Sequence, residues 1–345
     1  MRSRLAVLLV ACLLTGCAAG SGTPVPDAGQ GAGATGPAAA PAASPAAGAE
    51  QLAPFFQSTP SPLPGVFIRQ DGKLAYVDGD RRVELTMGAH PSALAAGERV
   101  LLSDDRQTYW FDWKVGTLQA IPGLPPVAQA AGRGTTYVLR TYREALVWTP
   151  GQDPVKLAQP DHVFGLTGVS LSPDGRYAVA AFDLDIPEGP RAGAVWAYDL
   201  QTGQIAPWPI ETPRFGYGAW LLGWSGPHTL RFVFGYHGNC VGYTWALPDK
   251  EPVLDGTGYR MMSDAWPTSD GAWFLYSPIP EQAVVQSIQP DSRPLDLPFP
   301  LCGAYDPRIL LNGHPAGYQS GNPRVWFEVL PDGTLRRWEG AEALF

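Results

Sequence analysis

The sequence has 345 residues, a formal net charge of −8 and only 16% charged side chains. Its Lys and Arg residues are scattered, which argues against nucleic acid or an anionic lipid surface as the main partner, because both need a basic patch. The chain from residue 52 onward is long enough for one large β domain or two ordinary domains, and we favour one.

The first 16 residues have the three parts of an export signal. Arg2 and Arg4 come first, an apolar run spans Leu5–Leu14, and the small residues Thr15 and Gly16 follow. The run is too short for a permanent membrane-spanning helix, which needs about 20 apolar residues. We therefore predict that residues 1–16 are a signal peptide.

The end of this signal, Leu14-Thr15-Gly16-Cys17, resembles the lipobox of bacterial lipoproteins. The resemblance implies that Cys17 is acylated with diacylglycerol and becomes the mature N-terminus; the alternative is an ordinary secretory signal that contains a cysteine. Two or three acyl chains would give lasting attachment. We expect an extracytoplasmic protein on the cell membrane or the outer membrane. Ala18 resembles the pattern sent to the outer membrane, but the sequence leaves open whether the host has one membrane or two.

Residues 17–51 form a segment of low complexity. From Ala18 to Glu50 almost every residue is Ala, Gly, Pro, Ser or Thr, and none is Lys, Arg or aromatic. Such a stretch has no apolar surface to bury and cannot offset the entropy of ordering its backbone. We predict a lipidated cysteine followed by a disordered stalk, and a folded domain over residues 52–345.

Short β-branched and aromatic runs separated by turn residues dominate the rest of the chain, with no convincing stretch at helical spacing. The clearest unit spans residues 166–208. It contains a first run that ends in Ser172, the tight-turn sequence Ser172-Pro173-Asp174-Gly175, and then runs at 176–182, 194–199 and 204–208. Pro presets φ and Gly accepts a positive φ in such a turn. Four antiparallel strands in a meander follow.

Fainter copies of this unit precede and follow it at a spacing of about 40 residues, the period of a four-stranded propeller blade. They span residues 92–121, 127–157, 219–254, 261–297 and 309–338. Residues 66–86 supply three further strands, and the sequence does not show which strand closes the ring. We predict an all-β propeller of four-stranded antiparallel blades, seven in number, with six as the alternative. Six tryptophans have a core or blade-interface role as their first explanation: Trp196, Trp224, Trp245, Trp266, Trp273 and Trp326.

The turn at 172–176, followed by Val195-Trp-Ala-Tyr-Asp-Leu-Gln-Thr-Gly203, resembles the repeat of TolB-like and WD40-like β-propellers of bacterial envelopes. The resemblance is strong in this unit, fair at 261–297 and faint elsewhere. It implies the architecture, and no particular function comes with it.

In such a meander, the loops between second and third strands emerge on the same side as the connections between blades. Binding residues are often carried on loops of a rigid scaffold. Two such loops, 183–191 and 235–240, are the candidate binding surface, with these candidate residues: Asp183, Asp185, Glu188, Arg191, Tyr236, His237 and Asn239. A Ca²⁺ site on the three acids of the first loop is conceivable. Their spacing matches no known calcium loop, so we predict a solvated acidic loop, no metal and no cofactor.

Cysteine and histidine chemistry gives few further signals. Cys240 and Cys302 are the two cysteines left in the mature domain and are either a disulfide pair across blades or two buried thiols. The sequence has no G-x-S-x-G elbow, H-E-x-x-H helix, Gly-rich phosphate loop or C-x-x-C pair. The five histidines lie in different units, and a structural role is the first explanation for each.

We therefore predict a monomeric, non-catalytic binding or scaffold propeller that contacts an envelope protein, peptide or glycan. A propeller enzyme, such as a hydrolase or lyase with its site at the central opening, is the main alternative, and a structural cell-surface protein is the third. Acidic and histidine side chains meeting at the axis would favour the enzyme. An exposed aromatic or apolar patch on the loop side would favour a protein partner.

Overall fold

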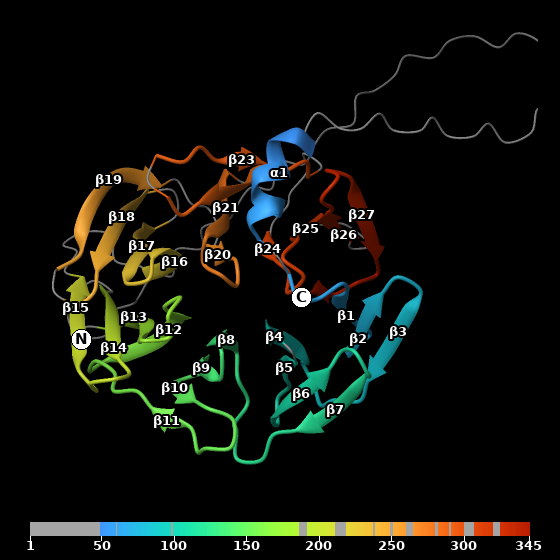
Figure 1. Ribbon diagram of the computed structural model, residues 1–345, viewed down its shortest axis with the longest axis horizontal. Helices are drawn as coiled ribbons and strands as arrows, with labels where there is room; N and C mark the ends of the chain where they lie inside the picture. The colour runs from blue at the N-terminus through green and yellow to red at the C-terminus, as the bar shows by residue number, and fades with distance from the viewer. Residues whose placement is uncertain are drawn as a thin grey trace, which may run out of the picture. The chain divides into compact units, whose positions relative to one another are not determined.

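The computed structural model describes residues 49–345 except 60, 98, 186–191, 211–218, 237–238, 249–250, 260–264, 280–281, 290, 300–306 and 320–324. The described residues form seven four-stranded antiparallel sheets arranged as blades around an axis (Figure 1). The predicted all-β propeller is confirmed, with seven blades rather than six. The predicted signal peptide, the lipidation site and the stalk up to residue 48 lie outside the described residues.

The strands of each blade follow one another from the axis outward. Blade 1 contains β28 (Ala343–Leu344), β1 (Val66–Gln70), β2 (Lys73–Asp78) and β3 (Arg81–Leu85). Blade 2 contains β4 (Ser92–Ala96), β5 (Val100–Ser103), β6 (Thr108–Asp112) and β7 (Thr117–Ala120); blade 3 contains β8 (Gln129–Arg133), β9 (Thr136–Arg140), β10 (Ala145–Trp148) and β11 (Val155–Lys156). Blade 4 contains β12 (Val163–Leu171), β13 (Tyr177–Leu184), β14 (Ala192–Asp199) and β15 (Ile205–Ile210); blade 5 contains β16 (Ala219–Gly226), β17 (Thr229–Tyr236), β18 (Asn239–Ala246) and β19 (Val253–Tyr259). Blade 6 contains β20 (Trp266–Pro267), β21 (Trp273–Ile279), β22 (Gln282–Ser287) and β23 (Leu295–Asp296); blade 7 contains β24 (Arg308–Ile309), β25 (Pro315–Gln319), β26 (Val325–Val329) and β27 (Leu335–Glu339).

The ring is closed by β28, which comes last in chain order but forms the innermost strand of blade 1. Leu344 pairs with Ile68 of β1. Beyond it, Phe345 N donates to Phe67 O at 2.9 Å, and Phe67 N donates to Phe345 O at 3.2 Å. The strand pairing therefore supplies the closure that the sequence could not assign.

Blade 4 has the turn geometry that its sequence predicts. Ser172 Oγ donates to Asp174 Oδ1 at 2.6 Å, and Gly175 has a φ of 75°, a left-handed conformation that glycine accepts without strain. The Arg176 guanidinium donates to Asp199 Oδ2 at 2.6 and 3.1 Å and joins two turns at one end of the blade. These bonds, with backbone N–H donors, lower the pKa of Asp199 to about 2.

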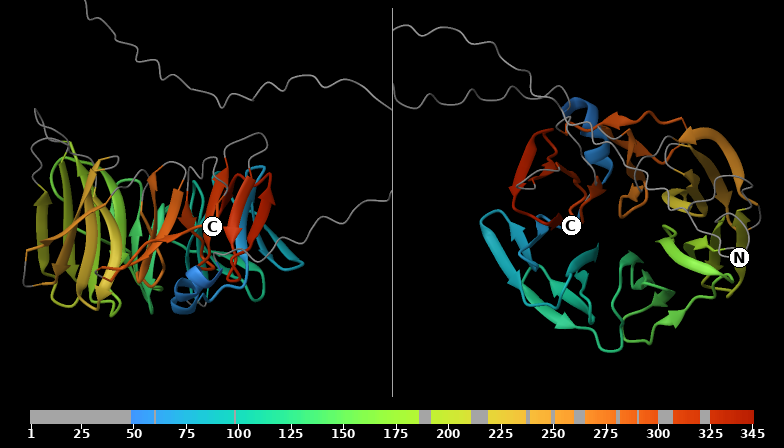
Figure 2. Two further views of the ribbon diagram at one scale, coloured as in Figure 1. Left: turned by 90° about the horizontal axis from the view of Figure 1, so that it is seen from above. Right: turned by 180° about the vertical axis from the view of Figure 1, so that it is seen from behind.

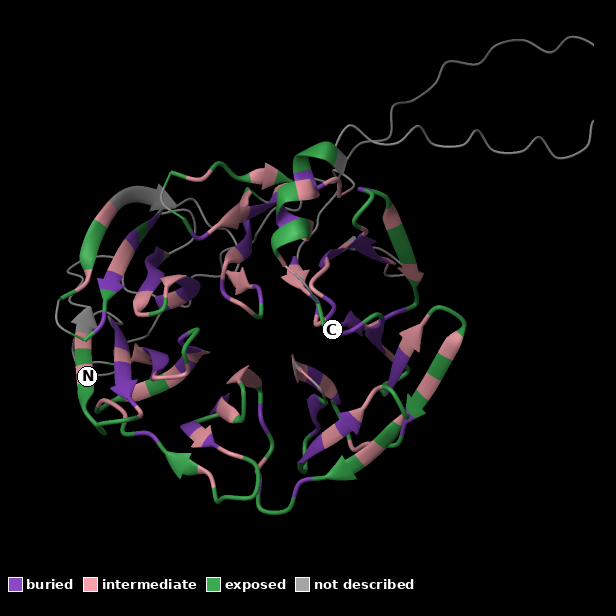
Figure 3. Cartoon of the chain, viewed as in Figure 1, coloured by how far each residue is buried: buried purple, intermediate pink, exposed green. Residues whose placement is uncertain are grey.

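The core consists of apolar clusters between neighbouring blades. Val179 of blade 4, for example, packs with Phe232 and Trp245 of blade 5. Figure 3 shows many buried positions on the middle strands of the blades and exposed positions along outer strands such as β3 and β7. Three of the six tryptophans assigned to structural roles, Trp224, Trp245 and Trp326, are buried.

One short helix, for which the sequence showed no helical spacing, precedes the blades. Helix α1 (Ala49–Ser58) begins three residues before the predicted domain boundary at residue 52. Leu52 and Phe55, on one side of the helix, are fully buried and pack in a cluster with Leu275 of blade 6 and Val329 of blade 7. The helix therefore covers the junction between these two blades.

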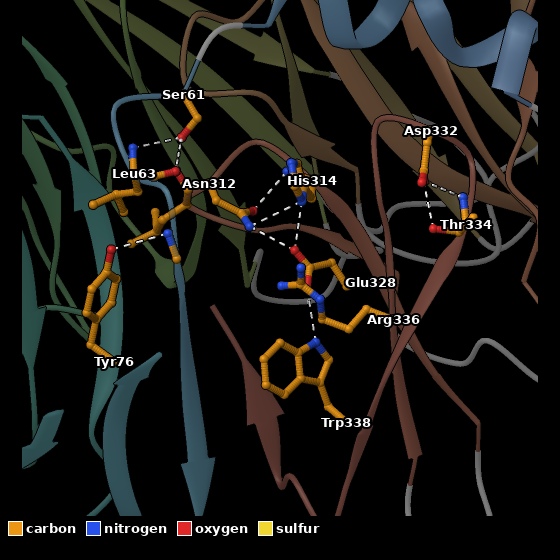
Figure 4. Close-up of polar contacts among 12 residues, drawn as sticks. Ser61, Leu63, Tyr76, Asn312, His314, Glu328, Asp332, Thr334, Arg336 and Trp338 are labelled. Atoms are coloured by element: carbon orange, nitrogen blue, oxygen red, sulfur yellow. Dashed lines mark hydrogen bonds and ion pairs between the residues drawn. The ribbon is translucent and has the colours of Figure 1, made fainter. Parts of the chain in front are cut away.

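A buried polar network lies in blade 7 beneath α1 (Figure 4). Glu328 is fully buried, and its Oε1 accepts from Asn312 Nδ2 at 2.9 Å and lies 2.7 Å from His314 Nδ1. Its Oε2 accepts from Trp338 Nε1 at 3.0 Å. The ring of Phe56 on α1 packs edge-on against His314. The carboxylate is thus satisfied on both oxygens, as a buried charge requires.

The ring has two faces, which we name by their loops. The turn face carries the hairpins between first and second strands and between third and fourth strands. The connection face carries the hairpins between second and third strands and the connections between blades. Helix α1 lies on the turn face, where Ser58 accepts from Trp273 Nε1 at 2.7 Å, and it is seen at one end of the strands in Figure 2. Within the described ranges, no helix has the length and apolar character needed to cross a bilayer.

Candidate binding site

The connection face contains a cavity of about 750 Å³, which we call the larger cavity. Four blades line it: Phe345 comes from blade 1, His90 from the connection into blade 2, Tyr142 from blade 3 and Trp326 from blade 7. This volume is typical of sites for small molecules or for a few side chains of a partner.

Arginine and aromatic side chains form one wall of the larger cavity. The guanidinium carbon of Arg308 lies 4.8 Å from the ring centre of Trp326, 5.4 Å from that of Trp266 and 5.8 Å from that of Phe345. The guanidinium carbon of Arg69 lies 5.9 Å from the ring centre of Phe345. Stacking on aromatic faces fixes the orientation of both cations.

Asp104 is a buried acid in the wall of the larger cavity and has a structural task. It accepts hydrogen bonds from the backbone N–H groups of Gly88, Arg106 and Gln107 and from the Tyr109 hydroxyl, at 2.6–2.9 Å. Burial raises the pKa of Asp104, but the bond from Tyr109 and the three backbone bonds outweigh it and lower the pKa below the ordinary value. Asp104 therefore holds the connection into blade 2 as a carboxylate.

Glu342 is a second acid of the larger cavity that is engaged by the protein itself. Its Oε1 accepts from Gly72 N at 2.9 Å, and its Oε2 lies 3.3 Å from Arg69 Nε. Asp105 is exposed. The cavity thus combines cations, aromatic rings and acids, with two of the acids already occupied.

A smaller cavity of about 560 Å³ lies beside the larger one, between blades 3 and 4. Arg143, Gln159, His162 and Asp185 contribute to its lining. Tyr142 lines both cavities and is 87% exposed, so the two cavities meet at its side chain.

A second exposed aromatic ring, that of Phe164, lines the smaller cavity and is 59% exposed. Single exposed apolar side chains are ordinary on protein surfaces. Here, however, Phe164 and Tyr142 line the same cavity. An aromatic surface on the loop side is the feature that the sequence analysis associates with a protein partner.

Two histidines in left-handed backbone conformations contribute to the two cavities. His90 has a φ of 53° and His162 a φ of 59°, uncommon values for residues other than glycine. Each lies in a connection before the first strand of a blade. Asp105 N donates to Ala89 O at 3.0 Å in one connection, and Asp185 N donates to His162 O at 2.8 Å in the other. In each connection, a backbone N–H from the loop between second and third strands therefore bonds to the chain at the histidine or next to it.

The structure places only part of the predicted binding surface. Asp185 lines the smaller cavity, and Asp183 is a half-buried residue in β13. Tyr236 and Asn239 form the last backbone pair of the β17–β18 hairpin. Three predicted residues lie outside the described ranges: Glu188, Arg191 and His237. The structure thus locates the side chains of Asp183 and Asp185. The binding role of all seven candidate residues stays a prediction.

Most residues of the larger cavity were missed by sequence reasoning. Arg69, His90 and Tyr142 lie in units whose repeat is faint, and Trp326 was assigned to the core. Ring closure brings these residues together from positions up to 257 apart, as Arg69 and Trp326 are. The exposed aromatic Tyr142 in a loop between second and third strands was the one local signal available.

The described residues place neither a metal site nor a disulfide. Among them, no group of three or more His, Cys, Asp or Glu side chains could hold a metal ion. Cys240 is buried in β18, and burial raises the pKa of its thiol to about 11. Cys302 lies outside the described ranges, so the predicted disulfide between the two stays a prediction, as does lipidation of Cys17.

No protein-family model and no curated protein matches this sequence. Solved structures do share its fold. The tricorn protease superposes with a TM-score of 0.57 at 12% identity, over 83% of this chain and 34% of that chain. A hypothetical selenium-binding protein from Sulfolobus tokodaii gives 0.55 at 12% identity, over 84% of this chain and 94% of that chain. This chain spans about a third of the length of the tricorn protease chain.

TolB from Acinetobacter baumannii gives a TM-score of 0.44 at 14% identity, over 81% of this chain and 63% of that chain. This value is too low to support an argument about TolB itself. At such identities the comparisons show a shared propeller fold and nothing of function.

Proposed function

We propose that the protein is an extracytoplasmic lipoprotein, held through Cys17 on the cell membrane or the outer membrane, whose propeller is a non-catalytic binding module. Its partner is an envelope protein, peptide or glycan, which binds on the connection face. The observation that carries this proposal is the pair of cavities that meet at the exposed ring of Tyr142. A module with a purely structural role has no need of such a surface.

The position of α1 supports the same arrangement. The described chain begins at Ala49 in α1, and α1 lies on the turn face, where Phe56 packs on His314 and Ser58 bonds to Trp273. Both cavities are on the connection face, so the described N-terminal end of the domain does not cover them.

Two contacts between a histidine and an acid lie away from both cavities, which favours binding over catalysis at the candidate site. His228 Nε2 lies 2.7 Å from Asp174 Oδ2, and His314 Nδ1 lies 2.7 Å from Glu328 Oε1. Both histidines belong to hairpins of the turn face, away from the two cavities. Among the described residues, His90 forms no hydrogen bond or ion pair with an acid of the larger cavity.

Site-specific photo-crosslinking in intact cells tests this proposal. A photoreactive residue at Tyr142 should give one discrete adduct. The matched control is position Val155 in the same blade, which is 64% exposed on the outer strand β11 and should give none. An absence of adducts at both positions, or the same adducts at both, would contradict a binding site on the connection face.

A further inference from the structure

The larger cavity contains a buried hydrogen-bond donor that lacks an acceptor. Trp326 is only 1% exposed and lines the cavity, and its indole Nε1–H has no hydrogen-bond partner within the described part of the structure. A buried N–H without an acceptor is costly, so its presence in a native fold requires an explanation. A ligand oxygen that enters the cavity supplies one.

Arg69 adds a second donor of the same kind. Its Nε–H is buried and lies 3.3 Å from Glu342 Oε2, but without the geometry of a hydrogen bond. The cation and the indole N–H both belong to the lining of the larger cavity, on blades 1 and 7. Two residues with an unpartnered donor thus line this space from the two sides of the ring closure.

Two of the three acids of the lining are already engaged by the protein, and the third, Asp105, is exposed. Asp104 already accepts four hydrogen bonds from its own loop and Tyr109. Glu342 is held by Gly72 and Arg69. Arg308, oriented by its stacking on Trp326, brings a second guanidinium to the same wall. The unpartnered donors of Trp326 and Arg69 therefore favour a ligand that is rich in acceptor atoms.

We propose that the larger cavity recognises a carboxylate group of the partner, with Arg69, Arg308 and the Trp326 N–H as its anchors. Guanidinium groups match a carboxylate in shape and charge, and the ring of Phe345 lies beside both arginines. The C-terminus of a peptide and an acidic sugar are the two sources of such a group in a cell envelope. This inference rests on the proposed binding function of the connection face.

Paired probes test whether the carboxylate is recognised and which kind of molecule carries it. The full chain in detergent is titrated with an N-acetylated alanine pentapeptide and its C-terminal amide, and with trigalacturonic acid and its methyl ester. We expect one of the free acids to bind, and its neutral partner to bind at least tenfold more weakly. The carrier that binds identifies the source of the carboxylate.

Variants locate the interaction in the larger cavity. Trp326→Phe removes the N–H and keeps a smaller aromatic ring in its place, and Arg69→Gln removes the charge. Each variant should weaken binding of the acidic probe at least tenfold, while the thermal unfolding temperature stays within a few degrees of that of the wild type. Arg82→Gln, which changes an exposed cation on the outer strand β3 away from both cavities, is the matched control and should leave binding unchanged.

The outcomes distinguish this inference from the proposed function. Equal affinity for acid and neutral probes, no binding of any probe, or full binding by Trp326→Phe and Arg69→Gln would overturn carboxylate recognition. In each case an adduct at Tyr142 would still support the connection face as a binding surface. Loss of that adduct would overturn the proposed function itself.

Discussion

Arg133 Nη1 donates to the backbone carbonyl of Ser269 at 2.5 Å, across the interior of the ring. Arg133 ends the first strand of blade 3, and Ser269 lies in the first turn of blade 6, so two whole blades separate them along the circumference. The bond therefore ties opposite sides of the turn face together. Burial lowers the pKa of the Arg133 guanidinium, and Asp270 raises it.

We expect Arg133→Met to lower the free energy of unfolding by about 1.5–3 kcal/mol, the usual range for a hydrogen bond with a charged partner. The free energy of unfolding of Arg133→Lys should lie between those of the wild type and Arg133→Met, because lysine keeps the positive charge but lacks the planar guanidinium group and its reach. Denaturant unfolding measures the change, with the exposed Arg143→Met as control. An unfolding energy for Arg133→Met equal to that of the control would show that the bond across the ring adds no stability.

The buried network at Glu328 predicts acid sensitivity. Burial raises the pKa of Glu328, but the hydrogen bond and charge of His314, the amide of Asn312 and the charge of Arg336 lower it below the ordinary value of 4.5. A carboxyl with a lowered folded-state pKa stabilises the fold above its unfolded-state pKa, and loses that contribution as the pH falls through the folded-state value.

We therefore expect the wild type to lose stability more steeply than Glu328→Gln between roughly pH 5 and pH 2. At neutral pH, Glu328→Ala should cost about 3–5 kcal/mol because it leaves three polar partners without their acceptor. Thermal unfolding across this pH range measures both effects. Parallel pH curves for wild type and Glu328→Gln would show that the carboxylate is not the titrating group.

Alanine substitution at two glycines with positive φ should lower the free energy of unfolding by very different amounts. A Cβ at Gly223, where φ is 143°, would lie 2.2 Å from the carbonyl oxygen of Gly271 in the next blade. A Cβ at Gly203, where φ is 73°, would meet nothing within 4 Å. Gly223→Ala should thus destabilise the protein by more than about 4 kcal/mol, and Gly203→Ala by about 1–2 kcal/mol. Chemical denaturation of the pair provides the test, and equal costs would contradict the close approach of blades 5 and 6.

The lipid anchor is tested by fractionation. Cys17→Ser removes the acylated thiol, so the variant should move to the soluble fraction with an unchanged unfolding temperature, because residue 17 lies far in sequence from the first described residue, Ala49. A Cys17→Ser protein that stays tightly membrane-bound would contradict anchoring through this residue.

The sequence predicted the blades where turn chemistry is local. The Ser-Pro-Asp-Gly turn at 172–175 specifies its hydrogen bonds within a few residues, so blade 4 was correct in each strand. Helix α1 was missed because ten residues with Pro54 inside are too short for a clear period, and its helical form depends on burying Leu52 and Phe55 between two blades. Tertiary packing decides such a segment.

The candidate site was predictable only in part. The rule that loops between second and third strands share a side with the connections led to Asp185, which does line a cavity. The larger cavity depends on residues from both ends of the domain, such as Arg69 and Arg308, and on a closing strand that the repeat did not reveal. Contacts between distant strands follow from the completed ring, and no local pattern encodes them.

The pairing of β28 with β1 also sets an order of events in folding. Because β28 follows every other strand described here, the inner edge of β1 has no partner until the rest of the propeller has been synthesised. Until then the chain exposes an unpaired strand edge, the feature most prone to pairing with another chain. The wall of the larger cavity that contains Glu342 and Phe345 is completed in the same step. Competence to bind is therefore acquired last, and a chain that stops short of β28 has neither a closed ring nor a finished site.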